Sequence, residues 1–335
     1  KEVFIFMPNI PHKTLIFVKI IFHFRNRISM NLKPLLFAAM AILSVLLINA
    51  QVTTQASKNS VEKSIERIMS QSGMETAAVS CYVVELGSGK TVADYNGMMS
   101  LTPASVMKVV TTSAAMEVLG PWYKFKTTLR HTGYVDSLGV LHGDLYVKGG
   151  GDPTLGSRFF HEEEEKKEFL QTWVDSIKAY GIKRIEGRVI ADASAFGQEM
   201  IPAGWSWGDL GNYYGSGPSG LTVYDNMTYL QFNSGTEEGD STVIDCIEPY
   251  VPEFTVQNFV TAANIKSDNA YVFGGPYQPE RYVDGAIPLD QEAFGVKASI
   301  HDPPLVLATD LTYMLEQNSI PVTYQCNTVR RLKWP

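Results

Sequence analysis

The sequence has few cysteines and no recognisable arrangement of metal-binding residues. Its three cysteines, Cys81, Cys246 and Cys326, are far apart and odd in number, so they predict neither a disulfide framework nor a zinc site. The six histidines show no H-x-x-H or H-E-x-x-H spacing, and nothing singles out a histidine-dependent triad. The sequence therefore offers no evidence for a metalloenzyme.

An excess of positive charge is also absent. The chain has 28 Lys and Arg against 35 Asp and Glu, which gives a formal net charge of −7. A protein that binds nucleic acid normally carries a basic face, so this composition argues against a nucleic-acid partner. The 335 residues are 45% hydrophobic and 19% charged, an ordinary globular composition that suffices for one large or two medium domains.

The N-terminal region predicts an export signal rather than a membrane span. Residues 1–29 mix apolar and basic side chains without helical or strand order, and we interpret them as translated sequence upstream of a start at Met30. A short positive segment (31–33) then precedes fifteen mostly apolar residues (34–48). A span needs about 20 apolar residues, so 30–50 is typical of a cleaved secretory signal peptide, with an uncleaved anchor as the alternative. We expect a periplasmic or cell-envelope protein with no stable membrane span after cleavage.

The first part of the mature chain predicts a helix, a hairpin and a second helix. In 57–72, apolar residues recur at helical spacing among charged ones. Residues 77–86 are rich in β-branched and aromatic side chains, and the turn at 87–89 precedes another short run, as in a β-hairpin. Thr102-Pro103 then opens an apolar helix, which ends at Gly120-Pro121.

The sequence pattern of the remaining residues differs from that of the first part. From 122 to about 300, short strand-like runs broken by Gly, Pro, Asp and Asn predict a strand-rich region. One amphipathic helix interrupts it at about 162–180, with the acidic residues 162–165 in its first turn. Residues 303–318 predict another amphipathic helix, and no regular structure is evident in the ending, 324–335.

Ser105 and Lys108 are the residues that most indicate catalysis. Residues three apart share one face of a helix, so the Lys108 amine can reach the Ser105 hydroxyl. Serine is a poor nucleophile until a base removes its proton, and lysine is that base only when burial or a neighbouring cation lowers its pKa. Ser105 also falls in the first helical turn, where free backbone N–H groups and the helix dipole favour a developing oxyanion.

The same spacing occurs at Ser60 and Lys63, so spacing alone is weak evidence. Ser60 belongs to a charged, solvent-facing helix with Glu62 beside Lys63, where the lysine would stay protonated. The helix that follows Ser105 is apolar instead. On these local features, an ordinary buried helix start explains Ser105 as well as a catalytic role does.

Longer stretches resemble one enzyme family. The segment T-P-A-S-V-M-K-V-V-T-T-S-A-A-M-E-V-L-G (102–120) resembles the nucleophile helix of penicillin-binding proteins and serine β-lactamases. The further stretches that carry the resemblance are 123–129, 141–155, 201–226, 284–288 and 302–308. They resemble the D-alanyl-D-alanine carboxypeptidase/endopeptidase family, the low-molecular-mass penicillin-binding proteins with a large inserted domain. The similar stretches occur in the same order as in that family, and together they cover about 57–320.

The resemblance implies an α/β fold, a β-lactamase/transpeptidase-like domain interrupted by a strand-rich inserted domain. Residues 51–121 would begin the catalytic domain, 122–300 would form the insert, and 301–335 would return to the catalytic domain. Ser105, with Lys108 as its base, would attack the carbonyl between the two terminal D-alanines of peptidoglycan stem peptides, or a peptide cross-link, and form an acyl-enzyme. β-Lactams would be trapped at the same serine, and no metal or organic cofactor is implied.

Two motifs of that family are missing where they are expected. S-x-N and K-T-G should follow the helix at 303–318, and the sequence ends first. Ser267-Asp268-Asn269 spells S-x-N but precedes that helix, and Lys90-Thr91 follows a glycine instead of preceding one. We therefore expect a C-terminally truncated chain with a foreign or frameshifted tail from about Tyr324, and little or no turnover by residues 51–335.

Other interpretations stay open. One is an inactive fragment or a non-catalytic cell-wall binding homologue, and another, less in keeping with the insert, is a β-lactamase or esterase of the same fold. The glycine-rich segment 149–153 lacks the third glycine of a dinucleotide-binding motif, so it predicts a tight turn. The aromatic residues Trp205, Trp207, Tyr213 and Tyr214 either pack an irregular loop or stack on glycan.

Export predicts a mature N-terminus near Ala50. Mass spectrometry of protein recovered from the cell envelope should find a chain that starts next to this residue, because the apolar segment ends there. A protein retained in the cytoplasm with residues 1–29 intact would contradict the interpretation of both N-terminal segments.

Overall fold

The computed structural model describes residues 3–5, 16–18, 60–160, 162 and 165–333, so the predicted signal peptide lies outside the described residues. The chain divides into two compact units, Lys1–Tyr123 and Lys124–Pro335, close to the boundary predicted at 121/122. In the first unit, β1 (Val3–Ile5) pairs antiparallel with β2 (Ile16–Val18). Among the described residues, no helix has the length and apolar character needed to cross a lipid bilayer.

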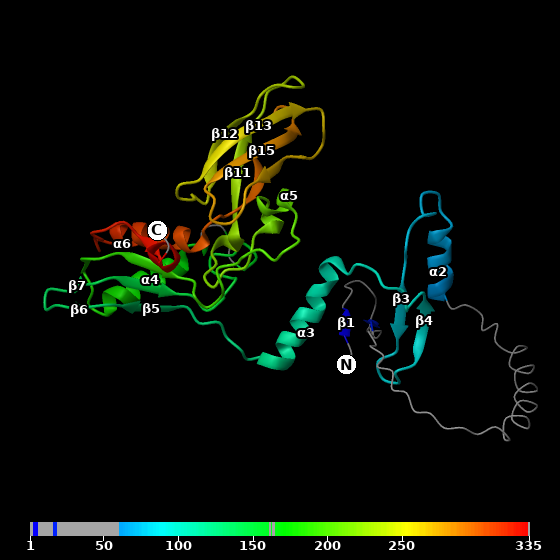
Figure 1. The fold of residues 1–335 in the computed structure, drawn as a ribbon, viewed down its shortest axis with the longest axis horizontal. Helices are drawn as coiled ribbons and strands as arrows, with labels where there is room; N and C mark the ends of the chain where they lie inside the picture. The colour runs from blue at the N-terminus through cyan, green and yellow to red at the C-terminus, as the bar shows by residue number, and fades with distance from the viewer. Residues whose placement is uncertain (1–2, 6–15, 19–59, 161, 163–164, 334–335) are drawn as a thin grey trace, which may run out of the picture. The chain divides into compact units, whose positions relative to one another are not determined.

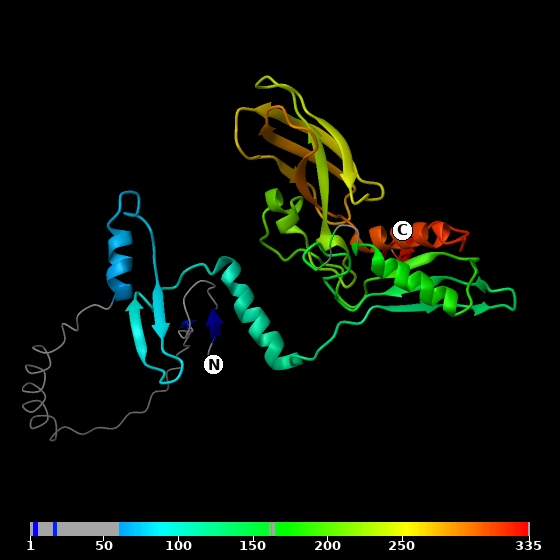
Figure 2. The same cartoon turned by 180° about the vertical axis from the view of Figure 1, so that it is seen from behind.

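A helix and a hairpin follow in unit 1, which confirms the prediction from the sequence. Helix α2 (Ser60–Met69) lies beside the antiparallel hairpin of β3 (Cys81–Val84) and β4 (Thr91–Tyr95) (Figure 2). Glu62 joins the two, because its Oε1 accepts a hydrogen bond from the Asp94 backbone N–H at 3.1 Å.

The apolar helix of unit 1 begins as a 3₁₀ turn and continues as an α-helix. Residues Ala104–Val106 form the turn, η1, and Met107–Leu119 form α3. Gly120 ends the helix with a φ of 78°, a conformation that glycine adopts without steric cost. The predicted start and stop are therefore confirmed. No residue of α3 is buried, and Val118 is 79% exposed, although the sequence of the helix is apolar.

Unit 2 contains two hydrophobic cores, and the first lies between a mixed sheet and two helices (Figure 1). The sheet has the order β17-β10-β8-β5, in which β8 pairs antiparallel with β5 and parallel with β10, and β10 pairs parallel with β17. The four strands are β5 (Thr128–His131), β8 (Leu145–Lys148), β10 (Val189–Asp192) and β17 (Asn327–Thr328). The two helices are α4 (Glu168–Ala179) and α6 (Pro303–Gln317).

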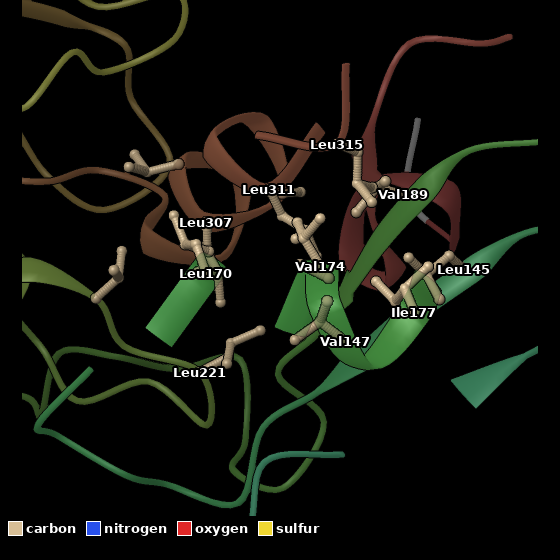
Figure 3. Close-up of a cluster of buried hydrophobic side chains, with 14 of the residues drawn as sticks. Leu145, Val147, Leu170, Val174, Ile177, Val189, Leu221, Leu307, Leu311 and Leu315 are labelled. Atoms are coloured by element: carbon tan, nitrogen blue, oxygen red, sulfur yellow. The ribbon is translucent and has the colours of Figure 1, made fainter. Parts of the chain in front are cut away.

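The first core is formed where α4 and α6 pack on this sheet. Its side chains include Leu170, Val174 and Ile177 of α4, Leu307, Leu311 and Leu315 of α6, and Leu145, Val147, Val189 and Leu221 (Figure 3). Burying each such aliphatic side chain contributes about 1.5–3 kcal/mol, so this cluster is a main source of the unit's stability. A small sheet of β6 (Tyr134–Val135), β7 (Val140–His142) and β9 (Arg184–Ile185) adjoins it.

The second core lies between two three-stranded sheets, whose orders are β12-β11-β16 and β13-β15-β14. The strands are β11 (Met227–Asn233), β12 (Val243–Glu248), β13 (Thr255–Ala263), β14 (Tyr271–Phe273), β15 (Glu280–Pro288) and β16 (Phe294–Ser299). Period-2 alternation positions the core, since Leu230 and Phe232 of β11 are fully buried while the alternating residues Tyr229 and Gln231 are half-buried.

The structure confirms the helix predicted at 303–318 as α6, whose apolar residues complete the first core of unit 2. It differs from the sequence expectations at two other places in unit 2. Helix α4 begins at Glu168 instead of near 162, so the acidic run precedes the helix and is not its first turn. The ending has regular structure, β17 and α7 (Val329–Lys333), because Thr328 is buried against the sheet.

Buried charged and ionisable residues lie between the end of β16 and the start of α6. Asp302 caps α6, because its side chain accepts a hydrogen bond from the Leu305 N–H. His301 is 3% exposed, and its imidazole stacks on Phe254 with ring centroids 5.8 Å apart. Burial and the charge of Arg281 lower the pKa of His301 to about 4. The neutral imidazole is thus the form that the fold stabilises.

The pKa of His301 predicts a loss of stability in acid. The imidazole of an unfolded chain titrates near pH 6.5, so the unfolded state takes up the proton first as the pH falls. His301 then contributes its full stabilisation above that pH, and this is lost between about pH 6.5 and pH 4, on the order of 2–3 kcal/mol. The other charged groups that act on the imidazole are Arg330, Arg331 and Glu253.

Urea unfolding at about pH 7 and about pH 4.5 measures this effect. The parent should lose more stability than the His301→Gln variant over this interval, by roughly the amount above. Comparing the two proteins removes the contribution of every other group, including Asp302, whose pKa is raised by burial. Equal losses in parent and variant would contradict the assignment.

Candidate active site

The structure brings Ser105 and Lys108 together. Ser105 lies in η1 and Lys108 in the first turn of α3, three residues further along the same helical face. The Lys108 Nζ donates a hydrogen bond to the Ser105 Oγ at 3.0 Å. To act as a base, the amine must be neutral and accept the hydroxyl proton along the same contact.

The residue before Ser105 has an unusual backbone conformation. Ala104 has a φ of 43°, in the left-handed region, where a side chain with a Cβ costs about 1–2 kcal/mol. Such strain is found where surrounding structure fixes a functional segment. Sequence reasoning missed this feature, because a glycine would have marked a left-handed position and an alanine does not.

The environment of the pair differs from the expectation in one respect. Ser105 and Lys108 are both exposed, as are Val106 and Met107 between them. The sequence predicts that burial or a nearby cation helps the lysine to lose its proton, and within the described residues the pair is open to solvent. The structure therefore shows the contact that general-base catalysis needs, without the low-dielectric surroundings that favour a neutral amine.

The second match to the motif does not form an equivalent pair. Ser60 and Lys63 are at the start of α2, and both are exposed or partly exposed. In the segment 60–160, no hydrogen bond joins their side chains, and the neighbouring Glu62 binds the Asp94 N–H. The two serines are thus distinguished by geometry as well as by sequence context.

Two stretches that spell or nearly spell family motifs have structural roles. In Ser267-Asp268-Asn269, the Asn269 Oδ1 accepts a hydrogen bond from the Ala286 N–H at 2.7 Å, which fixes the connection into β14. Lys90 and Thr91 belong to the hairpin, where the Thr91 hydroxyl lies 3.0 Å from that of Tyr82. Neither stretch is arranged for catalysis.

The glycine-rich segment 149–153 is a close-packed turn. A Cβ on Gly149 would lie 2.1 Å from the Gly220 carbonyl oxygen. Gly151 has a φ of 83°, and a Cβ there would lie 2.6 Å from the ring of Phe196. The turn predicted from the sequence is confirmed, and the glycines are there because backbone and ring approach them closely.

The aromatic residues of 201–226 form part of a half-exposed loop. Trp207 lies in α5 (Trp207–Leu210), and Tyr213 and Tyr214 lie in η3 (Tyr213–Gly215). The two tyrosine rings meet edge-on with centroids 5.4 Å apart, and the Lys297 ammonium lies 5.2 Å from the Tyr213 ring centroid. The described part of the chain contains no group of three or more His, Cys, Asp or Glu side chains placed to hold a metal ion.

Comparison with known proteins identifies the family. The model of the D-Ala-D-Ala carboxypeptidase 3 (S13) family matches residues 61–331, which include Ser105 and Lys108. The chain belongs to this family. The S13 match begins within α2 and ends within α7, so it covers both units of the structure.

Individual relatives support the assignment. The D-alanyl-D-alanine carboxypeptidase DacB of Haemophilus influenzae is 25% identical over 236 residues, which are 70% of this chain and 47% of DacB. The D-alanyl-D-alanine carboxypeptidase of Actinomadura sp. strain R39 is 26% identical over 270 residues, 78% of this chain and 48% of that protein. The chain spans about half the length of the curated relatives it matches.

Solved structures agree with the predicted α/β fold class. The crystal structure of penicillin-binding protein 4 (DacB) from Haemophilus influenzae matches with a TM-score of 0.56 and 25% identity, over 73% of this chain and 51% of that one. Another structure of that protein, in complex with a novel β-lactam, matches with a TM-score of 0.50 and 22% identity, over 72% and 48% of the two chains. The expected transpeptidase-type fold is therefore confirmed.

The contact between Ser105 and Lys108 predicts the reactivity of a thiol placed at the same position. In Ser105→Cys, the Lys108 ammonium should stabilise the thiolate and speed alkylation by iodoacetamide. We expect the rate at about pH 7 to be roughly three- to tenfold higher than in Ser105→Cys/Lys108→Met. Peptide mapping by mass spectrometry separates this thiol from the natural cysteines.

The second motif match supplies the control for this measurement. Ser60→Cys and Ser60→Cys/Lys63→Met should react at the same rate, because these two side chains are not in contact. Equal rates in the two Ser105 variants would show that the Lys108 amine does not lie beside position 105.

Proposed function

We propose that this protein is a serine-type D-Ala-D-Ala carboxypeptidase/endopeptidase that forms its acyl-enzyme at Ser105. One observation carries the proposal: the Lys108 Nζ lies 3.0 Å from the Ser105 Oγ at the start of a helix, inside the region that matches the S13 family. The proposed substrates are peptidoglycan stem peptides and their cross-links. The proposed location, outside the cytoplasm after cleavage of the segment 30–50, matches the location of such substrates.

The proposed reaction has two steps. In the first, the neutral Lys108 amine takes the proton of the Ser105 hydroxyl while its Oγ attacks the carbonyl carbon of the D-Ala-D-Ala bond. The C–N bond then breaks, and Lys108 returns the proton to the departing D-alanine amine. In the second step, water attacks the ester, Lys108 accepts a proton from the water, and Ser105 regains its hydroxyl hydrogen as the ester bond breaks.

The position of Ser105 assists the developing negative charge. The tetrahedral intermediate carries an oxyanion, and the N-terminal end of a helix provides unpaired backbone N–H groups and a positive dipole end. Removing one such donor from an oxyanion site typically costs about 10²–10³ in rate. A β-lactam would acylate the same serine through its strained amide carbonyl. In that case the amine stays attached as part of the opened ring.

The exposure of the pair favours a second candidate function for residues 51–335. General-base catalysis by an amine is favoured by low-dielectric surroundings, which this exposed pair lacks, so this segment by itself could bind cell-wall peptides without cleaving them. This candidate and the enzyme differ in one measurable quantity, the release of D-alanine.

Release of D-alanine from a pentapeptide that ends in D-Ala-D-Ala tests the proposal. With the protein expressed from its own gene, Ser105→Ala should lower turnover by at least about 10³-fold, because no other group can form the ester. Ser60→Ala, the matched control, should leave turnover unchanged. A separate assay on residues 51–335 distinguishes the enzyme from the binding protein. Turnover that survives in Ser105→Ala and is lost in Ser60→Ala would reverse the assignment.

A further inference from the structure

A groove built only from unit 2 lies outside the Ser105 site. Its volume is about 1010 Å³, at the upper end of the range of about 300–1,000 Å³ that is typical of ligand sites. One wall comes from the segment that precedes α4, the other wall comes from η4 (Tyr224–Asn226), and β11 and β12 form the floor. No binding site was predicted here from the sequence, because the parts of the groove are far apart along the chain.

The floor of the groove is the polar face of the β11–β12 pair. Leu230 and Phe232 of β11 point into the second core, so Tyr229 and Gln231 point to the opposite face. Glu248 of β12 is the cross-strand partner of Tyr229, and directly opposite residues share a face. The side chains of Tyr229 and Glu248 therefore project from opposite positions on this floor.

Arg158 brings a cation to the same floor. Its Nη1 donates a hydrogen bond to the Tyr229 hydroxyl, and its backbone N–H donates to the Asp225 Oδ2 at 3.2 Å. The Arg158 Nε is 3.9 Å from that oxygen, too far for a hydrogen bond, and it is buried without a partner among the described residues. An unpaired buried donor of this kind costs about 1–3 kcal/mol, which a bound acceptor would recover.

A second cation lies on the same wall as Arg158. The Lys167 Nζ is 3.7 Å from the Asp310 Oδ2, and the lysine side chain remains 54% exposed, so it is available to a ligand. The Tyr224 hydroxyl also donates to Asp310, and burial with the charge of Asp310 raises the pKa of Tyr224. The groove is thus lined by three cations and three carboxylates: Arg158, Lys166, Lys167, Glu162, Asp225 and Glu248.

The backbone beside these groups is strained. Tyr224, Asp225 and Asn226 have φ values of 52°, 57° and 55°, three successive residues in the left-handed region. Each costs up to about 1–2 kcal/mol. The bonds of Tyr224 to Asp310, of Asp225 to Arg158 and of Asn226 to the Gly217 carbonyl hold the turn. Strain that several contacts maintain in this way is characteristic of functional sites.

The charges select one class of ligand. A polyanion would meet the carboxylates of Glu248 and Asp225, and a neutral glycan would leave Arg158 and Glu248 desolvated without charged partners. A ligand that carries both a carboxylate and an ammonium group satisfies both walls. We propose that this groove binds a short zwitterionic peptide, a stem-peptide segment of peptidoglycan, at a site that does not include Ser105. The choice of peptidoglycan rests on the proposed function.

Calorimetric titration with the tripeptide L-Ala-γ-D-Glu-L-Lys tests this proposal. The probe lacks the D-Ala-D-Ala bond, and the protein carries Ser105→Ala, so the acylation step plays no part. Saturable binding is expected, with Kd raised at least about tenfold by Arg158→Met and about three- to tenfold by Glu248→Gln. The control is Arg184→Met, which removes an arginine 3.7 Å from Glu186 that lies outside the groove.

The outcomes separate this proposal from the proposed catalytic function. If Arg158→Met lowers the unfolding midpoint, Glu248→Gln and the exposed Tyr250→Ala carry the test. No saturable binding, or equal weakening by Arg184→Met, would overturn the groove assignment even if D-alanine release is intact. Binding of di-N-acetylchitobiose in place of the tripeptide would also overturn it. Tripeptide binding with this pattern of variants supports the groove assignment, whether or not Ser105 is acylated.

Discussion

The packing of unit 2 depends on one buried carboxylate, that of Asp302. It caps α6 at the Leu305 N–H and accepts a hydrogen bond from the Arg330 Nη2 at 2.8 Å. The same residue joins the last strand of the second core to the helix that completes the first core. Burial raises the pKa of Asp302, and Arg330 opposes this shift. Arg330 offsets the cost of burying the charge, so the C-terminal segment is part of the fold.

The elements that the sequence predicts correctly are those that local patterns determine. The helix α2 and the limits of α3 follow from spacing, a proline and a glycine. The packing partners of α6 could not be predicted in this way, because long-range contacts decide which core its apolar residues complete. The left-handed conformation of Ala104 is not marked by a glycine, and the groove around Arg158 depends on contacts between distant segments.

In the candidate active site, the contact between the two side chains could be predicted from the sequence, and their surroundings could not. The three-residue spacing on a helix suffices to bring the Lys108 amine to the Ser105 hydroxyl, so the contact follows from the sequence. Burial does not follow from spacing, and both side chains are exposed in the described part of the chain. The pair lies within the region that matches the S13 family. The proposed mechanism requires an environment in which Lys108 acts as a base, and this requirement is the part of the mechanism that experiment tests most directly.

The covalent adduct formed with benzylpenicillin is the most direct measurement of the central claim. The protein expressed from its own gene would be incubated with the antibiotic, digested, and mapped by tandem mass spectrometry. The account predicts that one penicilloyl group is attached to Ser105, within the peptide that contains the start of α3. An adduct on any other serine, Ser60 included, or an unmodified Ser105 in a protein that releases D-alanine, would contradict it.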